Sequence, residues 1–385
     1  MYGYFIHTME LSQSISTEEF NKLKMSIRLF PENKGADNNR WRSLDYEESG
    51  ITIVIRKSSL NEKLFLNRGK DYAIHILVNP SRLLVKSTYI NKIHTRGEIF
   101  YAIQSLEKLL LDIFSGSLSN LYEYKLTRID ITKDIIGIPE NLIHEYILLM
   151  RRMSLHSGYC FNTDLEKYCA EFRREDSVNI VSDSQGMEFV IYNKHRAVID
   201  NNYDDEILGY YENTMRMELR CNRKFIKVKT KHSDGIFDEI IDIYEKMHII
   251  VRNVFRHIFF DPDLCYVSGR LFNQIISEKC GTKKKKAYKM CHLGNLLRYS
   301  DGIKTIDDAI DEADYSDKVR SKLMYYFRSI GLSPLNMQDR NIGFLQSIQS
   351  VIEMSQPSEY EIEYLKMAYD HYGIKPFFHT KGVNG

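Results

Sequence analysis

The sequence predicts an α+β fold, in which a largely antiparallel sheet carries helices on one face and is followed by a mostly helical carboxy-terminal domain. Through about residue 225, segments with period-2 alternation of apolar and polar residues are interspersed with amphipathic helical segments, whereas the last third is helical in pattern almost throughout. The 385 residues are 43% hydrophobic, which excludes a disordered chain and suits one large or two ordinary domains. We therefore expect an α+β domain over residues 1–230 and a helical domain over residues 231–385.

The strands of the first domain are predicted from runs rich in β-branched residues. They are expected at residues 1–11, 51–56, 72–78, 122–133, 178–181, 187–194 and 215–221. Asn79-Pro80 ends the third of them, because proline cannot donate a hydrogen bond to a strand ladder.

Three helices are expected among these strands. Ser16 and Glu19 match the S-x-x-E capping box, which opens a helix that runs through Phe30. A second helix is predicted over residues 98–114, and a third begins at Pro139, where the missing N–H costs nothing, and ends near Met153. Helices of the carboxy-terminal domain are predicted at residues 235–259, 269–279, 284–298, 315–330, 342–354 and 358–371.

Charge and hydropathy limit where the protein acts. The 53 basic and 52 acidic side chains leave a formal charge of +1, so a nucleic-acid surface must come from local clustering. The amino terminus lacks the pattern of a secretory signal, and the most apolar stretch, near residues 249–260, carries Arg252 and Arg256. The six cysteines form no CxxC pair, which favours reduced, buried thiols. We expect a soluble, cytoplasmic protein without a membrane partner.

Alternation within the predicted strands places polar side chains on one face of the sheet, because neighbours along a strand point to opposite sides. Four strands contribute to this face. Its expected members are His75; Arg128, Asp130, Thr132 and Asp134; Glu188, Tyr192 and Lys194; and Arg216, Glu218 and Arg220.

This set of side chains suits phosphoryl transfer. Two carboxylates and an imidazole, here Asp130, Glu218 and His75, are ligands for a hard cation such as Mg²⁺ or Mn²⁺. Arginine and lysine bind neighbouring phosphates, and a tyrosine hydroxyl can act as nucleophile. A sheet with one wet face also alternates in this way, so the pattern alone leaves open a face that is merely solvated.

Several other classes of protein are disfavoured by missing motifs. The chain has no GxxxxGK phosphate loop and no GxGxxG after a strand, which argues against P-loop motors and Rossmann dehydrogenases. His144-Glu145 begins like a zinc-protease HExxH motif, but Leu148 stands where the second histidine belongs. No GxSxG elbow of an α/β-hydrolase is present.

Four short motifs, in their order and spacing, resemble those of the filamentous-phage gene-two endonucleases and related rolling-circle plasmid replication proteins. They are VNPSRLL (78–84), LTRIDIT (126–132) followed by an amphipathic helix, FVIYNK (189–194) and MRMELR (215–220). Together they span roughly residues 70 to 225, a little under half of the chain.

The resemblance implies roles for individual residues. In that family the tyrosine of the YxK segment cuts one DNA strand and stays joined to the 5′ phosphate, which points to Tyr192, with Lys194 beside it. The family's RID and R-x-E motifs match Arg128 with Asp130 and Arg216 with Glu218. The histidine-hydrophobe-histidine metal motif of broader rolling-circle enzymes is missing, so His75 is expected as third ligand from strand phase alone. No second tyrosine lies four residues after Tyr192, where Arg196 stands.

A lysine run in the carboxy-terminal domain has two interpretations. Lys283, Lys284, Lys285, Lys286 and Lys289 open a predicted helix. Such a run is often only a solvated helix face, but in an origin-binding protein it is also suited to DNA phosphates. We keep it as a hypothetical DNA-binding patch, together with Arg216 and Arg220.

The residues and the resemblance together predict a replication-initiation protein: a Mg²⁺- or Mn²⁺-dependent, site-specific DNA nickase and strand transferase that starts rolling-circle replication of a phage or plasmid. Its expected partners are single- and double-stranded origin DNA, with a host helicase or polymerase as further candidates. The alternatives are an origin- or operator-binding protein that cuts nothing, a conjugative relaxase with the same chemistry, and a scaffold with a solvated charged face.

Overall fold

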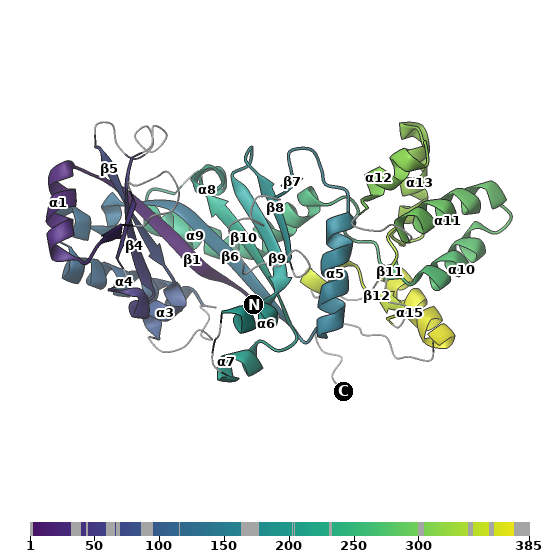
Figure 1. The fold of residues 1–385 in the computed structure, drawn as a ribbon, viewed down its shortest axis with the longest axis horizontal. Helices are drawn as coiled ribbons and strands as arrows, with labels where there is room; N and C mark the ends of the chain where they lie inside the picture. Colours follow the sequence, from purple (N-terminus) through teal and green to yellow (C-terminus); the bar gives the residue numbers. More distant parts are fainter. Residues whose placement is uncertain are drawn as a thin grey trace. The chain divides into compact units, whose positions relative to one another are not determined.

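The computed structural model is an α+β protein with a large antiparallel sheet and a helical carboxy-terminal region, which confirms the predicted class (Figure 1). The structure describes residues 3–31, 40–43, 45–58, 66, 70–85, 95–114, 116–162, 177–201, 203, 205–230, 233–298, 304–337, 342–353 and 358–372. Within these ranges, no helix is long and apolar enough to cross a lipid bilayer.

The chain divides into two compact units, each assembled from separated stretches. The first comprises residues 1–133, 182–189 and 218–250, and the second comprises residues 134–181, 190–217 and 251–385. This division does not coincide with the single boundary predicted at residue 230, because strands β6, β9 and β10 and helix α9 each contribute residues to both units.

The first unit contains the greater part of the sheet. Its strands are hydrogen-bonded in the order β2-β3-β4-β5-β1-β6, followed by its parts of β10 and β9. The strands are β1 (Tyr4–Ile15), β2 (Phe30–Pro31), β3 (Arg40–Ser43), β4 (Ile51–Lys57), β5 (Tyr72–Val78), β6 (Lys125–Ile136), β9 (Met187–Asn193) and β10 (Thr214–Asn222). The helices are α1 (Thr17–Ser26), α3 (Pro80–Leu84), α4 (Arg96–Ile113), α8 (Arg223–Lys229) and α9 (Ile236–Ile258), with short 3₁₀ turns at Glu47–Ser49, Gly116–Ser119 and Leu121–Glu123.

The register of β1 sorts this part of the sheet into an apolar and a polar face. On the apolar side, Leu11 lies opposite Ile76, and Ile76 lies opposite Ile53 on β4. Helix α1 covers this side, since Phe20 stacks on Tyr72 with ring centroids 4.3 Å apart and also contacts Trp41.

On the polar side of β1, Ser12 lies opposite His75 of β5, and Glu10 lies opposite Arg128 of β6. The predicted alternation is therefore present in the structure, and it gathers the charged side chains of several strands on one face of the first unit.

The predicted capping box of the first helix is confirmed. The Ser16 hydroxyl accepts a hydrogen bond from the backbone N–H of Glu19 at 3.2 Å, and the Glu19 carboxylate accepts one from the N–H of Ser16 at 2.7 Å. Thr95 and Glu98 form the same arrangement at the start of α4, where no capping box was predicted. Helix α4 therefore begins at Arg96, slightly before the predicted residue 98.

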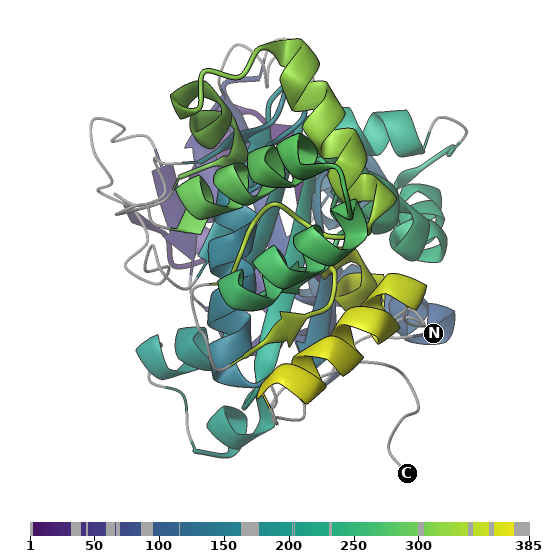
Figure 2. The same cartoon turned by 90° about the vertical axis from the view of Figure 1, so that its right-hand side faces the viewer.

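The second unit contains the remaining sheet residues and the carboxy-terminal helices. Its parts of β6, β10, β9 and β8 (Ser177–Ser182) follow one another in that order and end with β7 (Cys160–Phe161), and β11 (Tyr266–Val267) pairs separately with β12 (Phe344–Leu345). Its helices are α5 (Glu140–Arg152), α6 (Lys194–Asp200), α7 (Asp205–Tyr210), α10 (Gly269–Cys280), α11 (Lys284–Arg298), α12 (Ile306–Glu312), α13 (Asp317–Ser329), α14 (Ile348–Glu353) and α15 (Glu359–Tyr372). In Figures 1 and 2, α11 lies between α10 on one side and α12 and α13 on the other.

Side-chain caps explain two differences from the predicted elements. The predicted strand at 187–194 ends at Asn193, because the Asn193 side chain accepts a hydrogen bond from the N–H of Arg196 and starts α6. Lys194 is consequently the first residue of a helix and not a strand residue. The predicted helix at 342–354 is instead strand β12 followed by α14, whose first turn is capped by the Ser347 hydroxyl.

The cysteines that the structure describes are all free thiols, and Cys169 lies outside the described residues. Cys221 and Cys265 are buried, and burial raises the pKa of both thiols well above the usual value. Both therefore stay protonated and unreactive at neutral pH.

Candidate functional site

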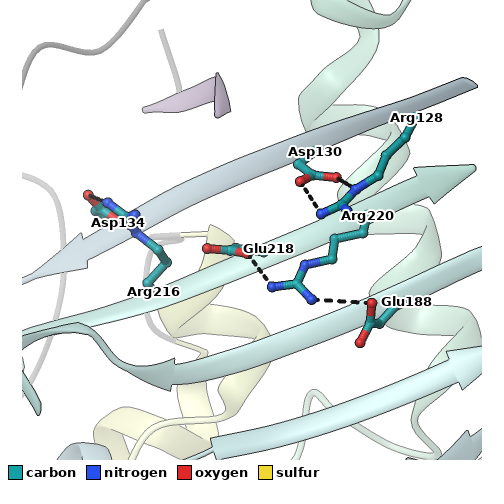
Figure 3. A network of polar contacts seen from close by, with 7 residues as sticks. All are labelled: Arg128, Asp130, Asp134, Glu188, Arg216, Glu218 and Arg220. Atoms are coloured by element: carbon teal, nitrogen blue, oxygen red, sulfur yellow. Dashed lines mark hydrogen bonds and ion pairs between the residues drawn. The ribbon is translucent and has the colours of Figure 1, made fainter. Parts of the chain in front are cut away.

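Asp130 lies on the polar face of β6 and is held by an arginine of the same strand. The Arg128 guanidinium donates two hydrogen bonds to it, from Nε to Oδ1 at 2.8 Å and from Nη2 to Oδ2 at 2.6 Å (Figure 3). The Asp130 side chain is 2% exposed, whereas that of Arg128 is 36% exposed. The guanidinium therefore faces solvent more than the carboxylate that it neutralises.

Glu218 lies in a similar arrangement on β10, the strand next to β6. Arg220 donates to Glu218 Oε2 at 3.1 Å and to Glu188 Oε2 of β9 at 3.3 Å (Figure 3). One guanidinium thus bridges two carboxylates from adjacent strands. The Nε of Arg220 is buried and has no acceptor among the residues that the structure describes.

Asp130 and Glu218 lie close enough to influence each other. Burial raises the pKa of Asp130, the hydrogen bonds and charge of Arg128 oppose this rise, and the negative charge of Glu218 adds to it, so that the pKa lies above the ordinary value of 3.8. The structure therefore brings the predicted acidic pair together within the first unit. It differs from the expected open face, because both carboxylates are buried next to partly exposed arginines.

His75 does not join this pair. Arg56 donates from Nε to His75 Nε2 at 3.0 Å, and His75 Nδ1 lies 2.9 Å from Glu10 Oε1 and 2.8 Å from the Ser12 hydroxyl. These partners assign Nε2 as an acceptor and Nδ1 as the protonated donor, which leaves neither ring nitrogen available to a metal. In this structure His75 therefore belongs to a hydrogen-bond network with Arg56, Glu10 and Ser12, and its expected role as third ligand stays a prediction.

Glu10 connects His75 to the arginines of the same face. Burial alone would raise the pKa of Glu10, but the hydrogen bond from His75 and the positive charges of Arg128 and Arg56 lower it overall. Glu10 was not among the predicted site residues, although it lies in the first predicted strand and its phase there was a usable signal.

The described residues contain no group of three or more histidine, cysteine, aspartate and glutamate side chains that could hold a metal ion. A site with two protein ligands still fits the chemistry of magnesium, which commonly binds one or two carboxylates, substrate phosphates and several waters. Asp130 and Glu218 are the two carboxylates that would hold such an ion, provided that each releases an arginine when the cation binds.

Arg216 is the centre of a separate polar cluster in the second unit. It donates to Asp134 from Nε at 2.6 Å and from Nη2 at 2.9 Å (Figure 3). Its Nη2 also lies 3.3 Å from the Tyr211 hydroxyl. Burial alone would lower the pKa of Arg216, but Asp134, Tyr192 and Tyr211 raise it well above the usual value. Arg216 is therefore a permanently charged, buried guanidinium.

Tyr192 is a nearly buried residue of this cluster. It is 5% exposed and packs with the buried residues Val190 and Ala197. Lys194 lies with its Nζ 5.1 Å from the centre of the Tyr211 ring, and the Arg216 guanidinium lies 5.3 Å from the same ring. The structure thus places Tyr192, Lys194 and Arg216 in one unit, with both cations near the ring of Tyr211.

Tyr211 and Asp134 are the residues of this cluster that were not selected as site residues. Asp134 was already in the alternating pattern of β6, so its phase was a usable signal. Tyr211 follows α7 in a segment without a distinguishing motif, and only the fold brings it next to Arg216. Burial raises the pKa of Tyr211, and the positive charge of Arg216 partly offsets that rise.

The predicted lysine patch lies elsewhere in the second unit. Lys283 precedes helix α11, and Lys284, Lys285, Lys286 and Lys289 lie in its first two turns. None of these lysines belongs to the Arg216 cluster.

Comparisons with known proteins add a structural likeness. No protein-family model and no curated protein matches this chain. Among solved structures, the rolling-circle replication initiator protein from Geobacillus stearothermophilus is similar with a TM-score of 0.31 and 9% sequence identity, over 66% of this chain and 84% of that one. At this TM-score the likeness does not establish a shared fold or activity, so the function rests on the residues of this chain.

Proposed function

We propose that this protein initiates replication by cutting one DNA strand at a specific site and rejoining it through a phosphotyrosine link. The observation that carries the proposal is the convergence of Asp130 and Glu218, from neighbouring strands, next to the partly exposed guanidiniums of Arg128 and Arg220. Paired carboxylates beside arginines are suited to a phosphodiester and its counter-cation.

In the proposed reaction, the Tyr192 hydroxyl oxygen attacks the scissile phosphorus, and the bond from phosphorus to the 3′ oxygen breaks. The phenol proton is lost to solvent, and the departing 3′ oxygen takes up a proton as a free hydroxyl. The 5′ phosphate stays esterified to Tyr192. Because this ester conserves the energy of the broken bond, a 3′ hydroxyl reverses the step without ATP.

The neighbouring cations have separate roles in this proposal. Arg216 lies close to Tyr192 and supplies a positive charge beside the proposed nucleophile. Lys194 supplies a second charge in the same cluster. Arg128 and Arg220, whose side chains are partly exposed, bind non-bridging phosphate oxygens.

The proposal includes a divalent cation, Mg²⁺ or Mn²⁺, with Asp130 and Glu218 as its protein ligands. When bound, the cation would offset negative charge on the phosphate in an in-line displacement. Binding requires both carboxylates to be ionised and released from Arg128 and Arg220.

The direct test is a covalent adduct between full-length protein and origin-bearing single-stranded DNA in the presence of Mn²⁺, with the modified residue mapped by peptide mass. We expect the adduct on Tyr192 and none with Tyr192→Phe. Tyr211→Phe is the matched control, since it removes a buried phenol from the same cluster and should keep the adduct. An adduct that persists in Tyr192→Phe and disappears in Tyr211→Phe would move the nucleophile to Tyr211.

A second candidate function is origin or operator binding without cleavage. It is favoured by the two hydrogen bonds that occupy both oxygens of Asp130, and by the 5% exposure of Tyr192. Metal-dependent relaxation of a supercoiled plasmid carrying the origin, measured beside binding, separates the two functions. Binding without relaxation would support the non-catalytic protein, and relaxation confined to a transfer origin would indicate a relaxase.

A further inference from the structure

Helices α11 and α13 form a groove in which seven of the eleven lining residues are lysines. The groove has a volume of about 710 Å³ and is lined by Thr282, Lys283, Lys284, Lys285, Lys286, Lys289, Lys318, Val319, Lys322, Leu323 and Tyr326. Lys318 and Lys322 come from α13 and lie one helical turn apart, so the fold adds two cations to those of the lysine run. None of the described residues that line the groove is acidic.

The seven lysines of the groove differ from Lys279 and Lys304 of the same unit. Lys279 and Lys304 are paired with Glu363 and Glu312, respectively. For the lysines of the groove, no ion pair with an acidic side chain is found within the described part of the chain. Because the whole chain has a formal charge of only +1, this is a strong local concentration of positive charge.

Aromatic side chains accompany these cations. The Nζ of Lys286 lies 3.7 Å from the centre of the Tyr326 ring, which connects α11 to α13. Tyr288 of α11 is 69% exposed and lies parallel to the ring of His292, and Tyr325 of α13 is 64% exposed. Tyr326 lines the groove, whereas Tyr288 and Tyr325 lie on the same two helices outside its lining. Exposed rings near lysines form stacking platforms for unpaired bases.

We infer that this α11–α13 groove binds a single DNA strand, with its lysines on the phosphates and with Tyr288 and Tyr325 stacking on bases. A duplex is a poorer fit, because its bases are already stacked and unavailable to the tyrosines. Lysine ammoniums on flexible stems act as point charges, so binding should depend little on sequence. The inference goes beyond the proposed nicking site and does not require that Tyr192 be a nucleophile.

The test is fluorescence anisotropy of full-length protein with a labelled mixed-sequence DNA strand, titrated at several salt concentrations, with the matching duplex alongside. We expect tighter binding to the strand. Lys318→Gln/Lys322→Gln should weaken it several-fold and reduce the slope of log affinity against log salt by about 1.4, since each phosphate contact on a single strand contributes about 0.7. Tyr288→Ala should weaken it about fivefold or more.

The matched control is Lys108→Gln/Lys366→Gln, which removes the same charge from exposed positions on α4 and α15. It should leave both affinity and salt slope unchanged. The inference is overturned if the control and Lys318→Gln/Lys322→Gln have the same affinity and salt slope. It is also overturned if the duplex binds as tightly as the single strand, or if the protein binds a nucleoside triphosphate but not the single strand. A protein that forms no phosphotyrosine adduct but keeps the expected binding pattern would contradict the proposed nickase and leave this inference standing.

Discussion

Arg128 and Asp130 lie two residues apart on strand β6 and form a bidentate ion pair, with N–O distances of 2.8 and 2.6 Å. Their spacing puts both side chains on the same face of the strand. Because both Asp130 oxygens are occupied, a divalent cation must compete with the guanidinium for them. This competition determines how the site should respond to substitution, pH and metal.

Removing the competing guanidinium should separate cation binding from catalysis. We expect Arg128→Gln to bind Mn²⁺ more tightly than the wild-type protein, because the Asp130 oxygens are then released, while adduct formation slows through loss of a phosphate contact. Mn²⁺ titration followed by electron paramagnetic resonance measures the first effect, and a single-turnover adduct assay measures the second. Weaker Mn²⁺ binding in this variant would show that the carboxylates are not the ligands.

The two proposed ligands should be distinguishable from their acidic neighbour. Asp130→Asn and Glu218→Gln are each expected to lower Mn²⁺-dependent adduct formation about 100-fold or more, because each removes a ligand. Glu188→Gln is the control, since Glu188 also binds Arg220 but is not a proposed ligand. If adduct formation falls equally in all three variants, the negative charge of this polar face matters and coordination of the cation does not.

Cation binding should decline with acid at a higher pH than for an ordinary aspartate. The pKa of Asp130 is raised above 3.8, and protonation removes its ability to bind Mn²⁺, so affinity should fall as pH falls through this raised pKa. Arg128 holds the pKa of Asp130 down, so Arg128→Gln should move the loss of Mn²⁺ affinity to higher pH.

The raised pKa of Asp130 also affects folding, because a group that is harder to ionise in the folded protein opposes folding when it is ionised. The contribution of the Asp130 side chain to the free energy of unfolding is most favourable below pH 3.8. It is lost as the pH rises through the pKa that Asp130 has in the folded protein.

His75 should affect stability and not metal binding. His75→Gln is expected to leave Mn²⁺ affinity unchanged and to lower the free energy of unfolding by about 1 to 3 kcal/mol, because Arg56 and Glu10 lose a buried partner. Denaturant unfolding beside a Mn²⁺ titration measures both quantities. A tenfold loss of Mn²⁺ affinity with normal folding would restore His75 as a ligand.

The buried pair of Arg216 and Asp134 should contribute far more to stability than an exposed pair. Both side chains are at most 3% exposed, so Arg216→Met leaves an uncompensated charge and should cost about 3–5 kcal/mol in unfolding free energy. The exposed pair of Arg196 and Glu140 is the control, and Arg196→Gln should cost no more than about 1 kcal/mol. Similar losses in both variants would contradict the burial argument.

Local signals in the sequence were sufficient for much of the fold. Strand β5 begins and ends at the predicted residues 72 and 78, and the capping box of Ser16 and Glu19 starts α1 as expected. Alternation along β6 and β10 also predicted that Arg128 and Asp130, and likewise Glu218 and Arg220, share a face. These features depend on neighbours within a few residues, so a pattern in the chain records them directly.

Contacts between distant segments could be settled only by the tertiary structure. His75 has the phase expected of a ligand, but the register of β1 against β5 gives it Glu10 and Ser12 as partners. The fold also brings Tyr211 to Arg216 and sets Lys318 and Lys322 beside the lysine run. Sequence periodicity by itself therefore determined which side of each strand is polar. Which polar groups meet depends on strand register and helix packing, which the apolar core sets through contacts that no local pattern encodes.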